Sequence, residues 1–543
     1  MITRLSQFKF LRLCFAYGIG VSQAFAQTIP NDGQILRTLP QPPAPIKKDL
    51  DFRLQADTLG DVSPGGSEIY VHRIKLSGNT IFDDTELVDH LGDIDGRWFD
   101  FSEIQAMANR LSDYYRDRGY SFAKVYVPKQ DVSAGTLELV VLEGKFGDIR
   151  TLGDEKYRKL VGGYLSSLEA GGVINGPALE AVFLKLGDVP GIRVAPVLKP
   201  GNVIGTGDLD VRVRPDTVPY SYVTTDNQGS RLSGKNRLSA GFSMPTIFGL
   251  AGHQINLHAT ATNKDLRVYG GGYSWPISNQ GARIRLDYTY VSYNLQDDTA
   301  QKFYGWAKIY RGTVSHILHR SQARNIILEY GFQEREAFSS VAGSPASDGS
   351  FKTLPIKIGF DLSDDFMSGG SWSGSVVYTR GRAKDNENTF DGLKKNWDKL
   401  SIDVTRRQNL GARWSASWRV SGQTSEDPIM DSSEQMSLGG LGGVRAYPSG
   451  EGSFSRVYVT QLELRYTAAA ASPYVFIDHA KGTAFEDIEP SDREIGGYGF
   501  GVRSQYAGWA LDAFVAHKRG GGISTSDNKF GDPVIQVSLQ KRF

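Results

Sequence analysis

An arginine in a glycine-rich segment and an aspartate further along the chain are the residues best placed to form a functional ion pair. Arg445 lies in residues 438–448, LGGLGGVRAYP, where the glycines permit tight backbone paths. Asp478 follows Phe476 in a stretch that alternates apolar and polar residues like a strand. An arginine can bind a carboxylate through two parallel hydrogen bonds, which fixes geometry better than a lysine would. The expected chemistry is therefore a pair that pins a loop to a wall.

The other patterns that could indicate catalysis, phosphate binding or metal binding are incomplete. His479 stands beside Asp478, but no serine or cysteine nucleophile motif accompanies the two. The glycines of 439–443 are not followed by the Gly-Lys-Ser/Thr of a phosphate-binding loop. The eight histidines show no metal-ligand spacing. We expect neither enzymatic activity nor a cofactor nor a metal.

The elements that would position the pair are strands. From Tyr220 to Phe543, segments of about ten residues alternate apolar and polar, which is typical of a transmembrane β-barrel with an apolar outer face. We count sixteen antiparallel segments, and the longest connection is 425–454, which carries Arg445. A barrel of this size has a lumen wide enough for an inserted plug. The expected strand cores are 220–228, 236–247, 253–262, 266–277, 281–294, 303–318, 323–336, 351–362, 371–382, 396–408, 411–424, 455–468, 472–479, 494–505, 508–518 and 532–543.

The connections and the last residue favour a barrel over a soluble β-sandwich, which would also alternate. Turns such as 409–411 are short, whereas the polar segments 337–349 and 384–394 are long, as expected for periplasmic turns and outer loops. Phe543 ends the final segment, and we expect it to act as the signal for the cell's barrel-assembly machinery.

The first residues of the chain have the pattern of an export signal. Residues 1–26 combine a basic start, a short apolar run and an Ala-Phe-Ala cleavage site, which predicts an export signal. The single cysteine, Cys14, lies inside it, so the mature chain has no disulfide. Residues 27–68 contain a proline-rich stretch after a possible short helix, either a disordered tether or a helix that docks elsewhere. The net charge of +1 argues against a nucleic-acid partner.

Two small α+β modules are expected at 69–148 and 149–216. In the first, a strand at 70–76 precedes helices that start after Asp83 and Asp100, and strands follow at 123–127 and 136–142. The second is a looser copy of this order, with a helix after Pro177 and strands at 194–198 and 208–213. The barrel then occupies 217–543.

Several of these residues resemble the motifs of a known family. Val444, Arg445, Ala446 and Tyr447 are similar to the V-R-G-Y/F tip of the sixth loop in the POTRA-plus-barrel outer-membrane superfamily. Phe476 and Asp478 resemble its F-x-D-x-G wall motif, whose aspartate meets the loop arginine. The chain departs from these patterns at Ala446 and Ala480, where the family usually has glycine.

The modules and the first strand extend the resemblance over the whole mature chain. Residues 77–82, 118–120, 127–131 and 143–144 resemble POTRA domains of the haemolysin-secretion type, and 226–231 with Gly234 resemble the first-strand motif. The order of parts is that of the TpsB transporters of two-partner secretion. The resemblance implies substrate docking near the following POTRA residues: Gly78, Asn79, Gly119, Tyr120, Pro128 and Gln130.

What the resemblance implies is a transporter in the outer membrane of a Gram-negative bacterium, in contact with its lipid and with POTRA domains in the periplasm. Such a protein recognises an unfolded TpsA-type exoprotein, a haemolysin, adhesin or filamentous-haemagglutinin-like chain, and passes it outward without ATP. Three alternatives are an assembly insertase of the same superfamily, a passive porin and a surface hydrolase. The last lacks any nucleophile arrangement, and a porin leaves the two modules unexplained.

Overall fold

The computed structural model describes residues 68–296, 301–385, 396–426, 433–484, 491–520 and 523–543. The expected export signal and the leader at 27–67 lie outside the described residues, as does most of the segment 384–394. In the described part of the chain, no helix combines the length and the apolar character needed to span a membrane.

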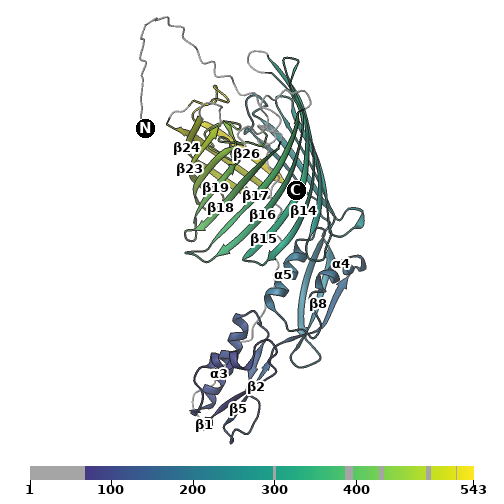
Figure 1. Ribbon diagram of the computed structural model, residues 1–543, viewed down its shortest axis with the longest axis vertical. Coiled ribbons are helices and arrows are strands. Elements are labelled where there is room, and N and C mark those ends of the chain that lie inside the picture. Colours follow the sequence, from purple (N-terminus) through teal and green to yellow (C-terminus); the bar gives the residue numbers. More distant parts are fainter. Residues whose placement is uncertain (1–67, 297–300, 386–395, 427–432, 485–490, 521–522) are drawn as a thin grey trace, which may run out of the picture.

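The C-terminal part is a closed barrel of sixteen antiparallel strands, which confirms the predicted fold class and strand count (Figure 1). Each strand pairs with the next along the chain, and the last, β26, returns to β9. The strands are β9 (Tyr220–Asp226), β10 (Arg237–Pro245), β11 (Gln254–Thr262), β12 (Leu266–Pro276), β13 (Arg283–Gln296), β14 (Lys302–Arg320), β15 (Arg324–Val341), β16 (Ser344–Asp364), β17 (Gly370–Asp385), β18 (Asn396–Asn409), β19 (Trp414–Thr424), β22 (Arg456–Tyr466), β23 (Ser472–Ala484), β24 (Ser491–Tyr506), β25 (Trp509–Arg519) and β26 (Val534–Arg542).

Alternation along these strands creates two different faces. Leu286, Val475 and Ile535 are more than half exposed on the outer surface, because the barrel presents them to lipid. Their polar neighbours point inward. Lys541 interrupts the outer face near the end of β26, but its ammonium group reaches the carbonyl oxygen of Ala507 at 2.8 Å and lies over the ring of Trp509.

The prediction of a long outer loop at 337–349 is wrong. Residues 337–349 do not form a long outer loop, because β15 and β16 continue through them and join at a tight turn where Ala342 and Gly343 have positive φ. Their polar composition reflects strands that extend beyond the apolar band, where both faces meet water. Polarity alone therefore does not distinguish a loop from a strand end above the membrane.

The first module has the predicted order of strand, two helices and two strands. Strands β2 (Arg73–Ser77), β5 (Thr136–Leu142) and β4 (Lys124–Tyr126) form one sheet in that order, and β1 (Ile69–Val71) pairs with β3 (Arg97–Phe99). Helices α2 (Asp84–Leu91) and α3 (Phe101–Asp117) pack over it. Asp100 and Glu103 cap α3 reciprocally, as the sequence predicts.

The second module repeats this topology. Its sheet is β6 (Lys145–Gly153), β8 (Thr206–Pro215) and β7 (Ile192–Pro200) in that order, with helices α4 (Glu155–Leu165) and α5 (Gly176–Gly187). The sequence analysis missed α4. The expected boundary between 148 and 149 falls inside β6, whose pairing with β8 begins at Lys145. The second module therefore starts where the first sheet ends.

The second module lies against the barrel's lower rim, and the first is farther away (Figure 1). The Arg320 guanidinium donates to both carboxylate oxygens of Asp188, at 2.8 and 3.0 Å. The backbone N–H of Gln322 donates to Glu180 of α5 at 3.1 Å. These contacts hold the second module beneath one side of the pore.

Glu143 organises the first module from within. Its carboxylate is 3% exposed and accepts from the backbone N–H groups of Thr80 and Ile81, at 2.5 and 2.8 Å, and from the Tyr115 hydroxyl at 3.1 Å. Burial and the neighbouring Glu143 carboxylate raise the pKa of the Tyr115 phenol, which therefore stays protonated and able to donate at physiological pH.

We expect Glu143→Ala to loosen this turn, because the N–H groups of Thr80 and Ile81 and the buried Tyr115 hydroxyl would lose a charged acceptor, at a cost of about 3 kcal/mol. Hydrogen exchange in the intact protein should then show the amides of residues 80 and 81 exchanging about a hundredfold faster. Glu143→Gln retains an acceptor oxygen and should change exchange far less. Equal protection in the wild type and in both variants would contradict the assigned role.

Candidate functional site

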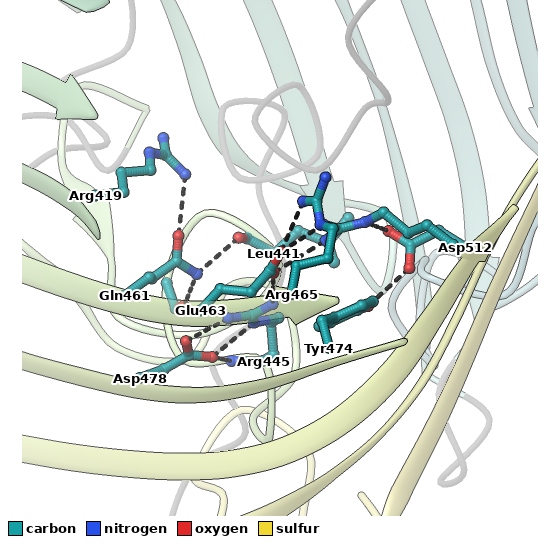
Figure 2. Close-up of polar contacts among 11 residues, drawn as sticks. Arg419, Leu441, Arg445, Gln461, Glu463, Arg465, Tyr474, Asp478 and Asp512 are labelled. Atoms are coloured by element: carbon teal, nitrogen blue, oxygen red, sulfur yellow. Dashed lines mark hydrogen bonds and ion pairs between the residues drawn. The ribbon is translucent and has the colours of Figure 1, made fainter. Parts of the chain in front are cut away.

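The predicted pore loop enters the barrel and folds against its inner wall (Figure 2). Short strands β20 (Met436–Ser437) and β21 (Ser453–Phe454) pair at its base. Within the tip, the N–H of Val444 donates to the carbonyl of Leu438 at 2.8 Å, and that of Gly440 donates to the carbonyl of Tyr447 at 3.1 Å. Gly440 has φ +86, a backbone conformation that favours glycine.

Arg445 and Asp478 form the predicted pair. Nε and Nη2 of Arg445 donate to the two carboxylate oxygens of Asp478, at 2.9 and 2.8 Å, and the backbone N–H of Arg445 adds a third bond at 3.0 Å. Asp478 is 1% exposed and Arg445 is 7% exposed. The guanidinium carbon also lies 3.6 Å from the ring centroid of Phe476. The loop tip is thus fixed to β23 by a bidentate, desolvated ion pair.

The pair continues into a network that the sequence analysis did not predict (Figure 2). Glu463 of β22 accepts from Arg445 at 3.3 Å and from Arg465 at 2.7 Å. Arg503 of β24 donates to both oxygens of Glu463, at 2.6 and 3.1 Å, and to Asp512 at 2.9 Å. Opposite charges alternate through the network, so each buried charge has an oppositely charged neighbour.

The rest of the tip is held by carbonyl contacts and apolar packing. The Gln461 amide donates to the carbonyl oxygens of Leu441 and Gly443, at 3.1 and 2.7 Å. Val444, Ala446 and Tyr447 are nearly fully buried against residues of β22 to β25, and Ala480 belongs to the same cluster. A Cβ atom added to Gly497 would lie 2.7 Å from the methyl group of Ala446. The methyl group of Ala446 therefore fits against β24 because Gly497 has no side chain.

The predicted POTRA residues occupy separate places in the first module. Gly78 has φ +87, and a Cβ there would lie 2.3 Å from the carbonyl oxygen of Val141. The Asn79 amide donates to the carbonyl of Phe82 at 3.0 Å, and the Tyr120 ring packs on the Phe82 ring with centroids 5.7 Å apart.

The other POTRA candidates contact the second module or a neighbouring strand. Gly119 follows α3 with φ +92 and faces Pro177 of the second module. Gln130 exchanges two 2.7 Å bonds with the backbone of Glu138, and its amide lies 3.4 Å from the carbonyl of Pro128. These residues shape the module through internal contacts, and their role in docking stays a prediction.

The sequence does contain a signal for two network residues that were not predicted, Glu463 and Arg465. Glu463 and Arg465 alternate with Leu462 and Leu464, so strand periodicity already places their charges on the inner face. The sequence did not show which of many inward charges lie next to Arg445, because that depends on strand register and shear.

A closed barrel plugged by its own loop, with two folded modules below the pore, defines the class of outer-membrane transporters with POTRA domains. Family comparisons agree with this class. The ShlB-type POTRA domain model matches residues 69–144. The model of the haemolysin secretion/activation protein ShlB/FhaC/HecB matches residues 205–504, and the chain belongs to this family.

Curated relatives span most of the chain. It is 24% identical over 474 residues to the "Heme/hemopexin transporter protein HuxB" of Haemophilus influenzae, covering 84% of this chain and 80% of the relative. It is 21% identical over 439 residues to the "Outer membrane transporter CdiB" of Dickeya dadantii, with 78% and 76% covered.

Solved structures share the fold. CdiB from Escherichia coli superimposes with a TM-score of 0.72 at 18% identity, covering 94% of this chain and 96% of that one. BamA from Haemophilus ducreyi, lacking POTRA domains 1–3, gives 0.51 at 14% identity, with 88% and 100% covered. Together, the family and the barrel place the chain in the outer membrane as a secretion transporter, and the family is one of transporters, not of enzymes.

Proposed function

We propose that this transporter receives an unfolded exoprotein in the periplasm through its two modules and passes it through the barrel without ATP. The observation that carries the proposal is the pore loop itself. It fills part of the lumen, yet only non-covalent bonds centred on Arg445 and Asp478 attach its tip to the wall. Such a plug can close the resting pore and still move.

The modules offer strand edges for docking. In the described part of the chain, β2 and β4 are the outer strands of the first sheet, and β6 and β7 are those of the second. An extended segment can add to such an edge through backbone hydrogen bonds, whatever its side chains. Val203 and Ile204, at the tip between β7 and β8, are 67% and 90% exposed and add an apolar contact surface. This suits an unfolded chain better than a folded ligand.

A path beside the loop supports passage through the lumen. A cavity of about 870 Å³ separates residues 439–442 of the loop from the wall of β17 to β19. Its wall carries small hydroxyl side chains at Ser375, Ser401 and Ser421. A second cavity of about 350 Å³ lies next to Arg445 and Glu463. The lining of the larger cavity combines these hydroxyl groups with charged side chains such as Arg419 and apolar ones such as Ile402, so a threaded chain would meet all three kinds of side chain.

The partner proposed here is a large exported protein of the TpsA type that carries a secretion domain. The relatives include a heme/hemopexin transporter and outer membrane transporters, so they do not point to one cargo. Outer-membrane lipid and the barrel-assembly machinery are the further partners that we propose. The insertase alternative gains less support, because the family match is to secretion proteins.

Reconstitution tests this function directly. The purified transporter in lipid vesicles should move a candidate exoprotein, taken from the neighbouring reading frame and offered unfolded, to a protease-protected interior without nucleotide. Vesicles containing an unrelated porin are the control. Transfer that required ATP, or equal transfer by the porin, would contradict the proposal.

A further inference from the structure

A short segment of the last outer loop contacts both the pore loop and the first barrel hairpin. It comprises residues 524–527, between β25 and β26, and we call it the bridging segment. Ser524 and Asp527 are 2% and 4% exposed. Burial this deep is unusual for a polar outer loop and indicates that the segment is packed between other elements.

On one side, the bridging segment surrounds Glu451 of the pore loop. The Glu451 carboxylate is fully buried and accepts from the N–H groups of Thr525 and Ser526, at 2.8 and 3.0 Å. The Ser524 hydroxyl donates to it at 2.7 Å, and Arg493 of β24 forms an ion pair with it. Glu451 thus attaches the pore loop a second time, six residues beyond Arg445, to a different part of the wall.

On the other side, Asp527 reaches the first hairpin. Nε of Arg231 donates to Asp527 at 2.7 Å, and both side chains are mostly buried. Arg231 ends the first-strand motif 226–231, which the transport proposal leaves without a role. The bridging segment therefore touches the hairpin formed by β9 and β10.

The same motif closes the barrel between its first and last strands. The Asn227 side chain accepts from the N–H of Val537 at 2.8 Å and donates to the carbonyl of Ile535 at 3.1 Å, which continues the β9–β26 pairing beyond Asp226. Asp226 itself is buried and accepts from Arg237 at 2.7 Å. The register joins only five residue pairs across this seam, against eight between β25 and β26, so these side chains supply a large part of its closure.

We propose that the bridging segment links two events: insertion of the pore loop and closure of the β9–β26 seam. The positioning residues are Glu451, on the pore loop, and Asp527, at the end of the bridging segment that faces the first hairpin. Because the four consecutive residues 524–527 hold both partners, loss of either contact shifts the segment and weakens the other. The first-strand motif then holds β9 and β26 together more tightly when the pore loop is inserted than when it has left the lumen.

The mature chain lacks cysteine, so introduced thiols report without background. Ala480 is fully buried behind the pore loop, so a cysteine at this position is shielded while the loop is in place. Faster maleimide labelling of Ala480→Cys therefore reports that the loop has left the wall. Thr225→Cys with Leu539→Cys places two thiols opposite each other across the seam, on the lipid side, and reports seam closure through disulfide yield. The protein without residues 1–26, which hold the single cysteine Cys14, is used in detergent micelles throughout.

We expect Asp527→Asn to speed labelling at position 480 on the order of tenfold, as the loss of one buried charge-assisted bond predicts. Glu451→Gln should lower the disulfide yield across the seam, because its amide would face the N–H groups of Thr525 and Ser526. Asp365→Asn, an exposed carboxylate in the turn at the opposite end of the barrel, should change neither reading.

Two outcomes would overturn the link. If each substitution affects only the reporter on its own side, residues 524–527 are two independent anchors. If neither reporter responds, although heat-modifiable gel mobility shows folded barrels, the segment holds neither element. The assay needs no exoprotein, so failure here is distinct from failure of the transport proposal.

Discussion

Arg445→Ala is expected to reduce exoprotein release by roughly tenfold or more while the barrel still assembles. Removing the guanidinium takes two of the three bonds from the buried carboxylate of Asp478, leaving only the bond from the backbone N–H of residue 445, and takes one partner from Glu463. Breaking a desolvated ion pair in this way costs about 3–5 kcal/mol, which is enough to detach the loop tip. The sixteen-stranded ladder does not depend on it. Secretion assays and heat-modifiable gel mobility measure the two effects separately.

The matched control is Arg465→Ala, which removes another guanidinium bound to Glu463 but leaves the loop contact intact. It should impair release much less. Arg445→Lys keeps the charge but cannot form the bidentate bond, so it should fall between the wild type and alanine. In the double variant with Asp478→Ala, the loss should be smaller than the sum of the single losses. Unchanged secretion in Arg445→Ala would refute the loop-anchor role.

The pair of Arg445 and Asp478 shows how much of the site could be predicted from the sequence. Alternation placed sixteen strands and put Asp478 on the inner face, because side chains in a strand point to opposite sides in turn. The chemistry of a loop arginine and a wall aspartate suggested that Asp478 pairs with Arg445, which lies 33 positions earlier in the chain, and the resemblance supported the same pair. Periodicity did not contribute to this pairing, since no local rule relates a loop tip to a wall strand.

The missed features have physical causes. Helix α4 contains Gly162 and Gly163, which are poor helix formers, so its apolar stripe of Tyr157, Val161 and Tyr164 was hard to recognise. Glu451 and residues 524–527 look like ordinary loop polarity in the sequence. Their burial arises only when two distant loops meet inside the mouth of a closed barrel, and that meeting depends on the shape of the whole barrel.

Deleting residues 70–215 is expected to abolish exoprotein release, because it removes both sheets and every strand edge proposed for docking. The barrel should still assemble, since its strands pair only with one another. In the part of the chain that the structure describes, the second module meets the barrel at its rim, for example through Arg320 and Asp188. A deletion of 70–144 alone leaves that rim contact in place and asks whether the first module is needed for capture.

The two deletions, compared with Arg445→Ala, separate capture from passage. If the modules capture the exoprotein, both deletion variants should fail to bind it in a co-purification assay, whereas Arg445→Ala should bind it normally and still fail to release it. Normal release by the larger deletion variant would end the docking proposal. Lost release with normal binding would move the modules' role from recognition to control of the pore they lie beneath.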